Sequence, residues 1–300
     1  MSAGIEIAHV LAALRARIDA WKRAGLRVGF VPTMGNLHEG HYSLVRLARE
    51  NADRVVASVF VNPTQFGPDE DFDRYPRTPG ADAAGLDAAG CDLAWMPSVE
   101  TMYPLGVTRA VRVQVPGITD VLDGAHRPGH FDGVCTVVAR LFNQVRPDVA
   151  VFGRKDYQQL AVIRHMVRDL AFPIEVLGAD IVREADGLAR SSRNQYLSGD
   201  ERALAPEIHR TLLSMRDAVQ AGGDRRQAEA AAVARLETAG FAVDYAVIRT
   251  PLLVEPAPTP GATQGLVGTG ADPAPDDARR VALIAARLGA TRLIDNLEFA

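Results

Sequence analysis

The order of apolar runs and helical periodicities along the chain predicts an α/β protein. Residues 28–33 form an apolar run, which breaks at Pro32 and loosens at Gly35, as is typical of a buried strand that ends in a loop. Apolar residues then recur at helical spacing, so we expect a helix to begin near Glu39. A second β-branched run at 53–61 predicts a parallel neighbour, because a helix separates the two strands. Further strands are expected at 91–97, 148–153 and 172–182, and helices at 5–24, 79–90, 132–145 and from 157 onward.

The last hundred residues show a different pattern. Helical spacing dominates from residue 201, and strand-like runs follow at 241–256 and within 281–299. Residues 256–278 are rich in Pro, Gly, Ala and Thr and predict a flexible loop. The pattern predicts a parallel-sheet domain followed by a smaller C-terminal α+β domain. We place the first domain at residues 1–185 and the second at 186–300. Residues 108–115 alternate valine with arginine and glutamine, which predicts a half-exposed strand.

Composition narrows the class of protein without naming its activity. The chain has 300 residues, 47% of them hydrophobic and 23% charged, with a net charge of -4. This charge gives no general case for binding nucleic acid or an anionic membrane. Cys91 and Cys135 are interpreted as reduced core residues, because two cysteines make neither a disulfide framework nor a metal cluster. No apolar run approaches the roughly 20 residues of a membrane span, and the N-terminus lacks a basic and apolar leader, so we expect a cytoplasmic protein.

The loop after the first strand has the features of an anion site. Strand, glycine loop and helix follow in order, so backbone N–H groups and the positive end of the helix point at whatever lies above the sheet, usually phosphate. His38 and His41 are three residues apart and can face one bound group. Each imidazole can donate a hydrogen bond to phosphate, and a protonated one adds positive charge. The alternative is a pair of surface histidines, which the preceding strand and loop disfavour.

The loop after the second strand holds a further candidate. Ligands of open α/β sheets gather at the carboxyl ends of strands, so residues 62–66 should lie beside the histidine loop. Gln65 can hold a carboxylate or a hydroxyl without adding charge, although simple solvation is the alternative. The acidic run at 68–78 could suggest a metal site, but we favour a solvated loop.

The end of the strand at 148–153 repeats this geometry, because a helix follows it directly. Lys155 can give a point charge to triphosphate oxygens. Asp156 can cap the helix or accept a hydrogen bond from a ribose hydroxyl, and both alternatives stay open. Gln159 lies four residues beyond Lys155, near the same face.

Two polar segments complete the candidates. The segment 183–194 holds Ser191, Ser192 and Arg193, which suit a loop that closes on phosphates, an interdomain linker, or both. His126, Arg127 and His130 lie among glycines in a segment that is either a basic loop over a phosphate site or a surface turn, and we leave them out of the catalytic prediction.

Several segments resemble a known family. His38-Glu39-Gly40-His41 resembles the H-x-G-H signature of the nucleotidyltransferases, which include the class I aminoacyl-tRNA synthetases. The segments that narrow the match are VPTMGNLHEGH, VFVNPTQFGPDEDFDRYPRT (59–78), RPGHFDGV (127–134), FGRKDYQQL (152–160), READGLARSSRN (183–194) and TRLIDNLEF (291–299). Together they resemble the pantothenate synthetases, also called pantoate–beta-alanine ligases. The resemblance is strongest from about residue 26 to about residue 200.

The resemblance implies a Rossmann-like nucleotidyltransferase domain that condenses (R)-pantoate with beta-alanine. ATP would first form pantoyl adenylate and pyrophosphate, and the amine would then give pantothenate and AMP, on the route to coenzyme A. It implies that Gln65 and Gln159 bind pantoate and that Gln65 also lies near beta-alanine. His38, His41 and Lys155 would be catalytic, with His41 as the proton donor. It implies ATP binding by Met34, Gly35, Asn36, Leu37, His38, Glu39, Gly40, His41, Gly153, Arg154, Lys155, Asp156, Val182, Arg190, Ser191, Ser192 and Arg193.

The resemblance also bears on cofactors and partners. Mg²⁺ is expected to arrive with ATP and to be held mainly by substrate oxygens, with no metal site of the protein's own. A homodimer is implied by resemblance alone. Arg154 stands where the family usually has Glu, Arg190 where many relatives have Met or Leu, and the loop at 256–278 is longer than usual. Two alternatives remain: a related transferase that moves AMP to a phosphate ester, and a nucleotide sensor without activity.

Overall fold

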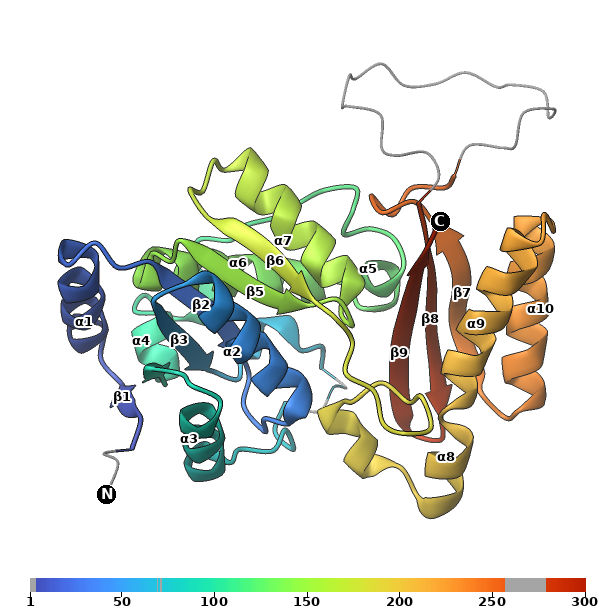
Figure 1. Cartoon of the computed structure of the whole chain (residues 1–300), viewed down its shortest axis with the longest axis horizontal. Coiled ribbons are helices and arrows are strands. Elements are labelled where there is room, and N and C mark those ends of the chain that lie inside the picture. The colour runs from blue at the N-terminus through green and yellow to red at the C-terminus, as the bar shows by residue number, and fades with distance from the viewer. Residues whose placement is uncertain (1–3, 69, 71, 257–278) are drawn as a thin grey trace. The chain divides into compact units, whose positions relative to one another are not determined.

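A computed structural model describes residues 4–68, 70, 72–256 and 279–300 (Figure 1). The chain divides into two compact units. The first comprises Met1–Val182 with Arg190–Ser192, and the second comprises Arg183–Ala189 with Arg193–Ala300. None of the helices in these described ranges has both the length and the apolar character needed to cross a bilayer.

The first unit is built on a six-stranded sheet in which every pairing is parallel. The strands are β1 (Glu6–Ala8), β2 (Val28–Thr33), β3 (Arg54–Val59), β4 (Leu93–Trp95), β5 (Val149–Gly153) and β6 (Glu175–Ala179). Their order is β1-β4-β3-β2-β5-β6. The chain therefore runs outward from β2 to β4 and then returns to β5 on the other side of β2. This reversal between β2 and β5 is the place where open α/β sheets bind their ligands, beyond the carboxyl ends of the strands.

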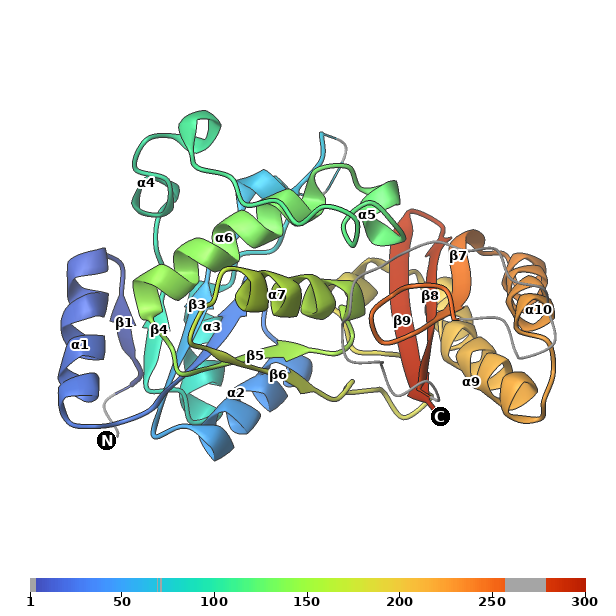
Figure 2. The ribbon, with the colours of Figure 1, turned by 90° about the horizontal axis from the view of Figure 1, so that it is seen from above.

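Helices cover both faces of this sheet, because neighbouring strand residues point to opposite sides. Phe30 of β2 and Phe152 of β5 pack in the core under α1 (Leu11–Arg23), α6 (His130–Val145) and α7 (Tyr157–Asp169). Val31 and Val151, one residue away on each strand, join the core under α2 (Glu39–Asn51) and α3 (Pro79–Ala88). Figure 2 shows α6 and α7 on one side of the sheet and α2 on the other. The shorter elements are α4 (Val99–Met102), α5 (Asp123–His126), η1 (Pro63–Gln65) and η2 (Val107–Arg109).

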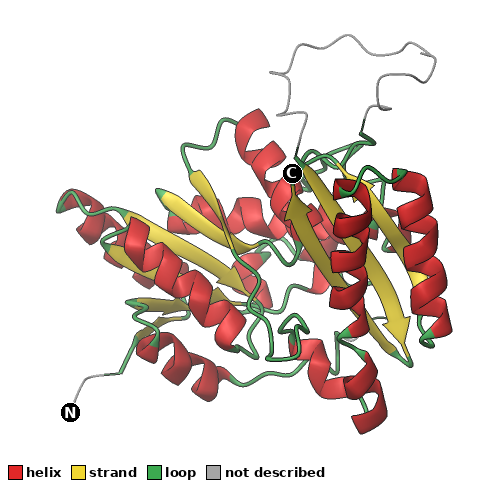
Figure 3. Ribbon diagram, turned by 45° about the vertical axis from the view of Figure 1, so that its right-hand side comes forward, coloured by secondary structure: helices red, strands yellow, loops and turns green. Residues whose placement is uncertain are grey.

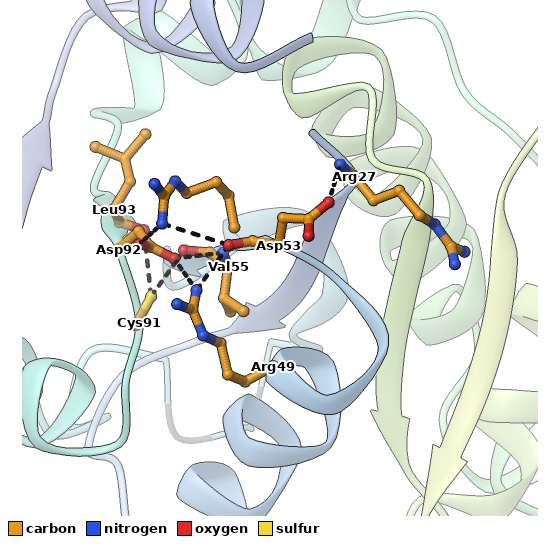
Figure 4. Close-up of polar contacts among 8 residues, drawn as sticks. Arg27, Arg49, Asp53, Val55, Cys91, Asp92 and Leu93 are labelled. Atoms are coloured by element: carbon orange, nitrogen blue, oxygen red, sulfur yellow. Dashed lines mark hydrogen bonds and ion pairs between the residues drawn. The ribbon is translucent and has the colours of Figure 1, made fainter. Parts of the chain in front are cut away.

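The edge of the sheet at which the strands begin, here the N-terminal edge, is tied together by carboxylates. Asp92 accepts a 2.8 Å hydrogen bond from the backbone N–H of Val55 and pairs with Arg49 Nη1 at 2.8 Å. Asp53 accepts a 2.8 Å bond from the backbone N–H of Arg27. Figure 4 shows these side chains together at the starts of the strands. The carboxylates thus satisfy strand-end N–H groups that would otherwise lack a partner.

The second unit is a small α+β fold. Its antiparallel sheet has the order β7-β8-β9, with β7 at Ala242–Arg249, β8 at Arg280–Leu288 and β9 at Thr291–Phe299. Ile208, Leu212 and Leu236 share one buried cluster with Ile248 and Ile284 of the sheet. Figure 3 shows the two long helices side by side along the strands. The helices are α8 (Gly199–Leu204), α9 (Glu207–Gln220) and α10 (Arg225–Thr238), and the turn η3 spans Ser192–Tyr196.

The structure confirms the predicted fold class and both cysteine interpretations, because Cys91 and Cys135 are buried and free. The strand predicted at 108–115 is wrong. The backbone N–H of Val113 there donates to Thr136 Oγ1 of α6 at 2.9 Å, so the extended segment lies on a helix and joins no sheet. Val113 and Val115 pack against the core, whereas Val111, which belongs to the same alternating pattern, is 76% exposed.

Two boundaries also differ from the prediction. The helix expected from residue 5 begins at Leu11, and Glu6–Ala8 instead forms β1, paired in parallel with β4. The strand expected at 241–256 ends at Arg249. Apart from Pro256, the loop predicted at 256–278 lies outside the described residues.

Candidate active site

Two histidines cap the helix that follows β2. His38 is the N-cap residue of α2, and its Nδ1 accepts a hydrogen bond from the backbone N–H of Gly40 at 3.1 Å. His41 Nδ1 accepts from the backbone N–H of His38 at 3.3 Å, which closes a reciprocal capping box. Because both Nδ1 atoms are acceptors, each neutral imidazole carries its proton on Nε2. The ring centroids lie 4.2 Å apart, so the loop presents two neighbouring Nε2–H donors.

The glycine between the histidines is required by this geometry. A Cβ at Gly40 would lie 2.9 Å from His38 Cε1 and 3.0 Å from His38 Nδ1. Any larger residue would push the His38 ring away from its capping position. Glu39, the variable residue of the signature, pairs with Arg46 along the surface of the same helix. The H-x-G-H pattern is therefore a helix cap made of imidazoles.

A buried carboxylate shapes the loop before the first histidine. Asp82 of α3 is 2% exposed and accepts hydrogen bonds from the backbone N–H groups of Asn36 at 3.1 Å and Leu37 at 2.8 Å. Gly35 has φ +88° and Asn36 has φ 51°, so the loop runs through the left-handed region that favours such residues. Sequence analysis missed Asp82, because nothing in an Ala-rich helix marks one aspartate as buried beneath a distant loop.

Both capping histidines are neutral at neutral pH. Burial lowers the pKa of His38 to about 4, and the nearby charges of Lys155 and Arg190 act in the same direction. Burial lowers the pKa of His41 to about 3, with His38 adding to the effect. The positive charge expected from a protonated imidazole is therefore absent from the chain itself, and the histidines serve as hydrogen-bond donors. The positive charge near His38 comes from lysine and arginine, and the Asp156 carboxylate acts on the pKa of His38 in the opposite direction.

The end of β5 supplies that lysine. Lys155 Nζ lies 3.6 Å from Asp156 Oδ1, and the Lys155 side chain is 20% exposed. Asp156 occupies the N-cap position of α7, but its side chain makes no capping hydrogen bond, which removes helix capping as the reason for this carboxylate. Arg154 turns away to β6, where its Nε donates to Gly178 O at 3.2 Å.

The loop after β3 places Gln65 next to the histidine loop, where the strand ends predict it. Gln65 is 8% exposed, and its Nε2 donates to the Met34 sulfur at 3.2 Å. Its Oε1 accepts from Asn62 Nδ2 at 3.1 Å. Asn62, 1% exposed, also accepts a 2.6 Å bond from the Tyr103 hydroxyl. Asn62 is a second residue that sequence analysis missed, although it lies in the same NPTQF segment.

The two neighbouring glutamines of α7 have different roles. Gln158 is buried, accepts from the backbone N–H of Asp123 at 2.9 Å, and donates to the carbonyls of Ile118 and Val121 at 2.8 Å each. It fixes the segment between η2 and α5. Gln159 is more exposed and makes no such bridge within the described residues. The structure therefore separates a structural amide from the amide predicted to bind substrate.

The expected ATP-binding residues are divided between the two compact units. Arg190–Ser192 belong to the first unit, and the Arg190 N–H donates to Val182 O at 2.9 Å. Arg190 is also close enough to influence His38 through its charge. Arg193 belongs to the second unit, so the first unit gathers the expected group without it.

Comparison with known proteins decides the family. The family model described as Pantoate-beta-alanine ligase matches residues 6–298, nearly the whole chain. The chain belongs to the pantoate–beta-alanine ligase family. A pantothenate synthetase of Stenotrophomonas maltophilia (strain R551-3) is 64% identical over 295 residues, which cover 98% of this chain and 100% of the relative. One of Xanthomonas euvesicatoria is 67% identical over 289 residues, which cover 96% and 98%.

Solved structures of pantoate–beta-alanine ligases share the fold. The crystal structure of pantothenate synthetase from Thermus thermophilus matches with a TM-score of 0.83 and 48% identity, covering 98% of this chain and 99% of that one. The ligase from Francisella tularensis, complexed with beta-gamma ATP and beta-alanine, matches with a TM-score of 0.77 and 29% identity, covering 98% and 97%.

Proposed function

We propose that this chain condenses (R)-pantoate with beta-alanine, at the expense of ATP, to give pantothenate, AMP and pyrophosphate through a pantoyl adenylate. The observation that carries the proposal is the pair of imidazole donors at the start of α2, after β2, with Lys155 after β5. Both lie where the strand order reverses. Family membership over residues 6–298 supports the choice of substrates.

In the first step, ATP lies along the loop 34–41 and the residues 153–156, with Val182 and residues 190–193 completing its site. A pantoate carboxylate oxygen attacks the α-phosphorus, and the bond to the bridging oxygen of pyrophosphate breaks. His38 and His41 donate from Nε2 to phosphate oxygens, and the Lys155 ammonium offsets the negative charge that grows there. An anionic phosphate raises the pKa of nearby imidazoles, so ATP itself favours proton donation by His41.

In the second step, Gln65 and Gln159 hold pantoate while beta-alanine approaches near Gln65. The amine attacks the acyl carbon, AMP leaves with the bonding electron pair, and the amine loses a proton as the amide forms. The rate gain comes from holding the two reactants together. A covalent thiol route is disfavoured, because burial raises the pKa of both Cys91 and Cys135 to about 12.

We further propose that Mg²⁺ enters on the triphosphate, that the enzyme is a cytoplasmic homodimer, and that the chain is organised as a catalytic domain at residues 1–185 and a smaller lid domain at residues 186–300. Mg²⁺ would be held mainly by substrate oxygens, because this ion keeps several waters and is usually bound through substrate phosphates.

The test is pyrophosphate release from MgATP and (R)-pantoate, before and after beta-alanine, for the wild type and His41→Ala. We expect release that requires pantoate, pantothenate and AMP only after the amine is added, and a folded variant with rates at least about a hundredfold lower. His165→Ala, an exposed histidine of α7, is the matched control. If ATP binds but pantoate releases no pyrophosphate, the related transferase or the sensor becomes the better account.

A further inference from the structure

Three side chains outside the proposed substrate contacts are linked by hydrogen bonds in a series that ends at the Gln65 carbonyl. Arg127 donates to both carboxylate oxygens of Glu70, from Nε at 2.6 Å and from Nη2 at 2.7 Å. This bidentate pair is partly buried, with side-chain exposures of 18% and 27%. Such a fork fixes the orientation of the guanidinium as well as its position. The pair joins the loop after η1 to the segment before α6.

The orientation of Arg127 determines the tautomer of His130. Arg127 Nη1 lies 3.0 Å from His130 Nε2, and His130 Nδ1 lies 2.8 Å from the Gln65 carbonyl oxygen. A guanidinium can only donate, so His130 Nε2 is the acceptor and Nδ1 carries the proton. The Nδ1–H group therefore donates to Gln65 O. Burial and the neighbouring Arg127 lower the pKa of His130 to about 4, in agreement with this neutral form.

The backbone around Gln65 is also clamped from the side of α6. A Cβ at Gly133 would lie 2.3 Å from Thr64 O and 2.6 Å from Gln65 Cα, so the first turn of α6 rests directly on η1. The Gly133 carbonyl also accepts a hydrogen bond from Asn62 Nδ2 at 3.1 Å. His130 is part of that same turn. Gln65 is thus held through its own carbonyl and through the contact beneath it.

We propose that Glu70, Arg127 and His130 are positioning residues that fix Gln65 for pantoate, an inference that rests on the proposed function. They act through hydrogen bonds in series, from Glu70 to Arg127, His130 and the Gln65 carbonyl. This role differs from both alternatives that the sequence left open, a basic loop over phosphate and a surface turn, because the Arg127 guanidinium is engaged by a carboxylate and an imidazole. This series of hydrogen bonds therefore sets the affinity of the enzyme for pantoate and leaves its affinity for ATP unchanged.

A matched pair of substitutions separates the roles of the two ring nitrogens of His130. The amide nitrogen of Asn stands near the Nδ1 position, whereas the amide of Gln reaches the Nε2 position. His130→Asn keeps the donor to Gln65 O, and His130→Gln keeps a partner for Arg127 but loses that donor. We expect His130→Gln to raise the KM for pantoate about tenfold, with the KM for ATP within about twofold, and His130→Asn to stay within about threefold of the wild type.

Glu70→Gln supplies the second measurement, as a double-mutant cycle with His130→Gln. If the residues act in series, the double variant raises the pantoate KM no more than His130→Gln alone. Additive effects, an equal rise in the ATP KM, or a pantoate KM that is unchanged in His130→Gln would each overturn the proposal. His126→Gln, on the exposed end of α5, is the control. A wild type without pantoate-dependent pyrophosphate release would instead overturn the proposed function.

Discussion

At both edges of the parallel sheet a carboxylate accepts hydrogen bonds from backbone N–H groups, but it holds a different part of the structure at each edge. At the N-terminal edge, Asp148 accepts a 2.7 Å bond from the backbone N–H of Val28 and pairs with Lys22 at 3.1 Å. At the C-terminal edge, Asp82 accepts two backbone N–H bonds from the loop before His38. The first carboxylate holds a strand, and the second holds a loop that presents imidazole donors.

The two edges also differ in the groups on which their basic side chains act. Basic side chains at the N-terminal edge pair with the aspartates that hold the strands, as Arg49 does with Asp92. At the C-terminal edge, Lys155 and Arg190 influence His38 through their charge, beside the proposed anion site. Changes at the first edge should therefore mainly alter the free energy of unfolding, and changes at the second should mainly alter kinetics.

Asp92→Ala should produce the largest loss of stability. It removes the acceptor of the Val55 N–H and the partner of Arg49 and Arg54. We expect the free energy of unfolding to fall by about 2–4 kcal/mol, with kcat within about twofold at a temperature where the variant is folded. Urea unfolding and steady-state kinetics measure the two effects. A variant of unchanged stability and lowered kcat would reverse the assignment of this edge.

Asp82→Asn tests the role of the C-terminal edge of the sheet. An amide replaces one carboxylate oxygen, so one of the two loop N–H groups loses its acceptor. We expect the KM for ATP to rise about tenfold while the KM for pantoate stays within about twofold. Asp87→Asn, exposed on the same helix, is the control. Equal rises in both KM values would show that Asp82 supports the unit as a whole.

Protonation of the histidines at the C-terminal edge should have a smaller effect, which is a loss of stability as the pH falls. Burial holds the pKa of His38 at about 4 and that of His41 at about 3, below the ordinary 6.5. Below pH 6.5 the unfolded chain therefore binds more protons than the folded chain. The stability that the neutral histidines contribute is complete above pH 6.5 and is lost as the pH falls toward 4. We expect on the order of 1 kcal/mol less stability per histidine at pH 5 than at pH 7.

Urea unfolding at pH 5 and pH 7 measures this loss, and the double variant His38→Gln/His41→Gln should show a smaller one. A double variant with the wild-type dependence on pH would place the titration elsewhere, for example at His130, whose pKa is also lowered.

Local patterns predicted the sheet and its helices because those signals lie within a few residues. The strand, glycine loop and helix around His38 followed from periodicity and punctuation, and the structure confirmed them. The segment 108–115 misled the prediction, because alternation records burial on one face and does not reveal whether the partner is a strand or a helix.

The site was predictable where a short motif carries the chemistry. His38, His41, Gln65 and Lys155 stand in such motifs, and their roles stay predictions. Asp82 was not predictable, because its role depends on a loop that lies 45 residues earlier in the chain at Leu37. The tautomers of the histidines also required the structure, since they depend on which backbone N–H each Nδ1 accepts.

The most direct test compares the two lysines of the chain, since one lies at each edge. Lys155→Met and Lys22→Met are assayed side by side for pantoate-dependent pyrophosphate release and for urea unfolding. We predict that Lys155→Met loses about a hundredfold in rate with unchanged stability. Lys22→Met should keep its rate and lose up to about 1 kcal/mol of stability. Equal rate losses in both variants, or full activity in Lys155→Met, would contradict the account.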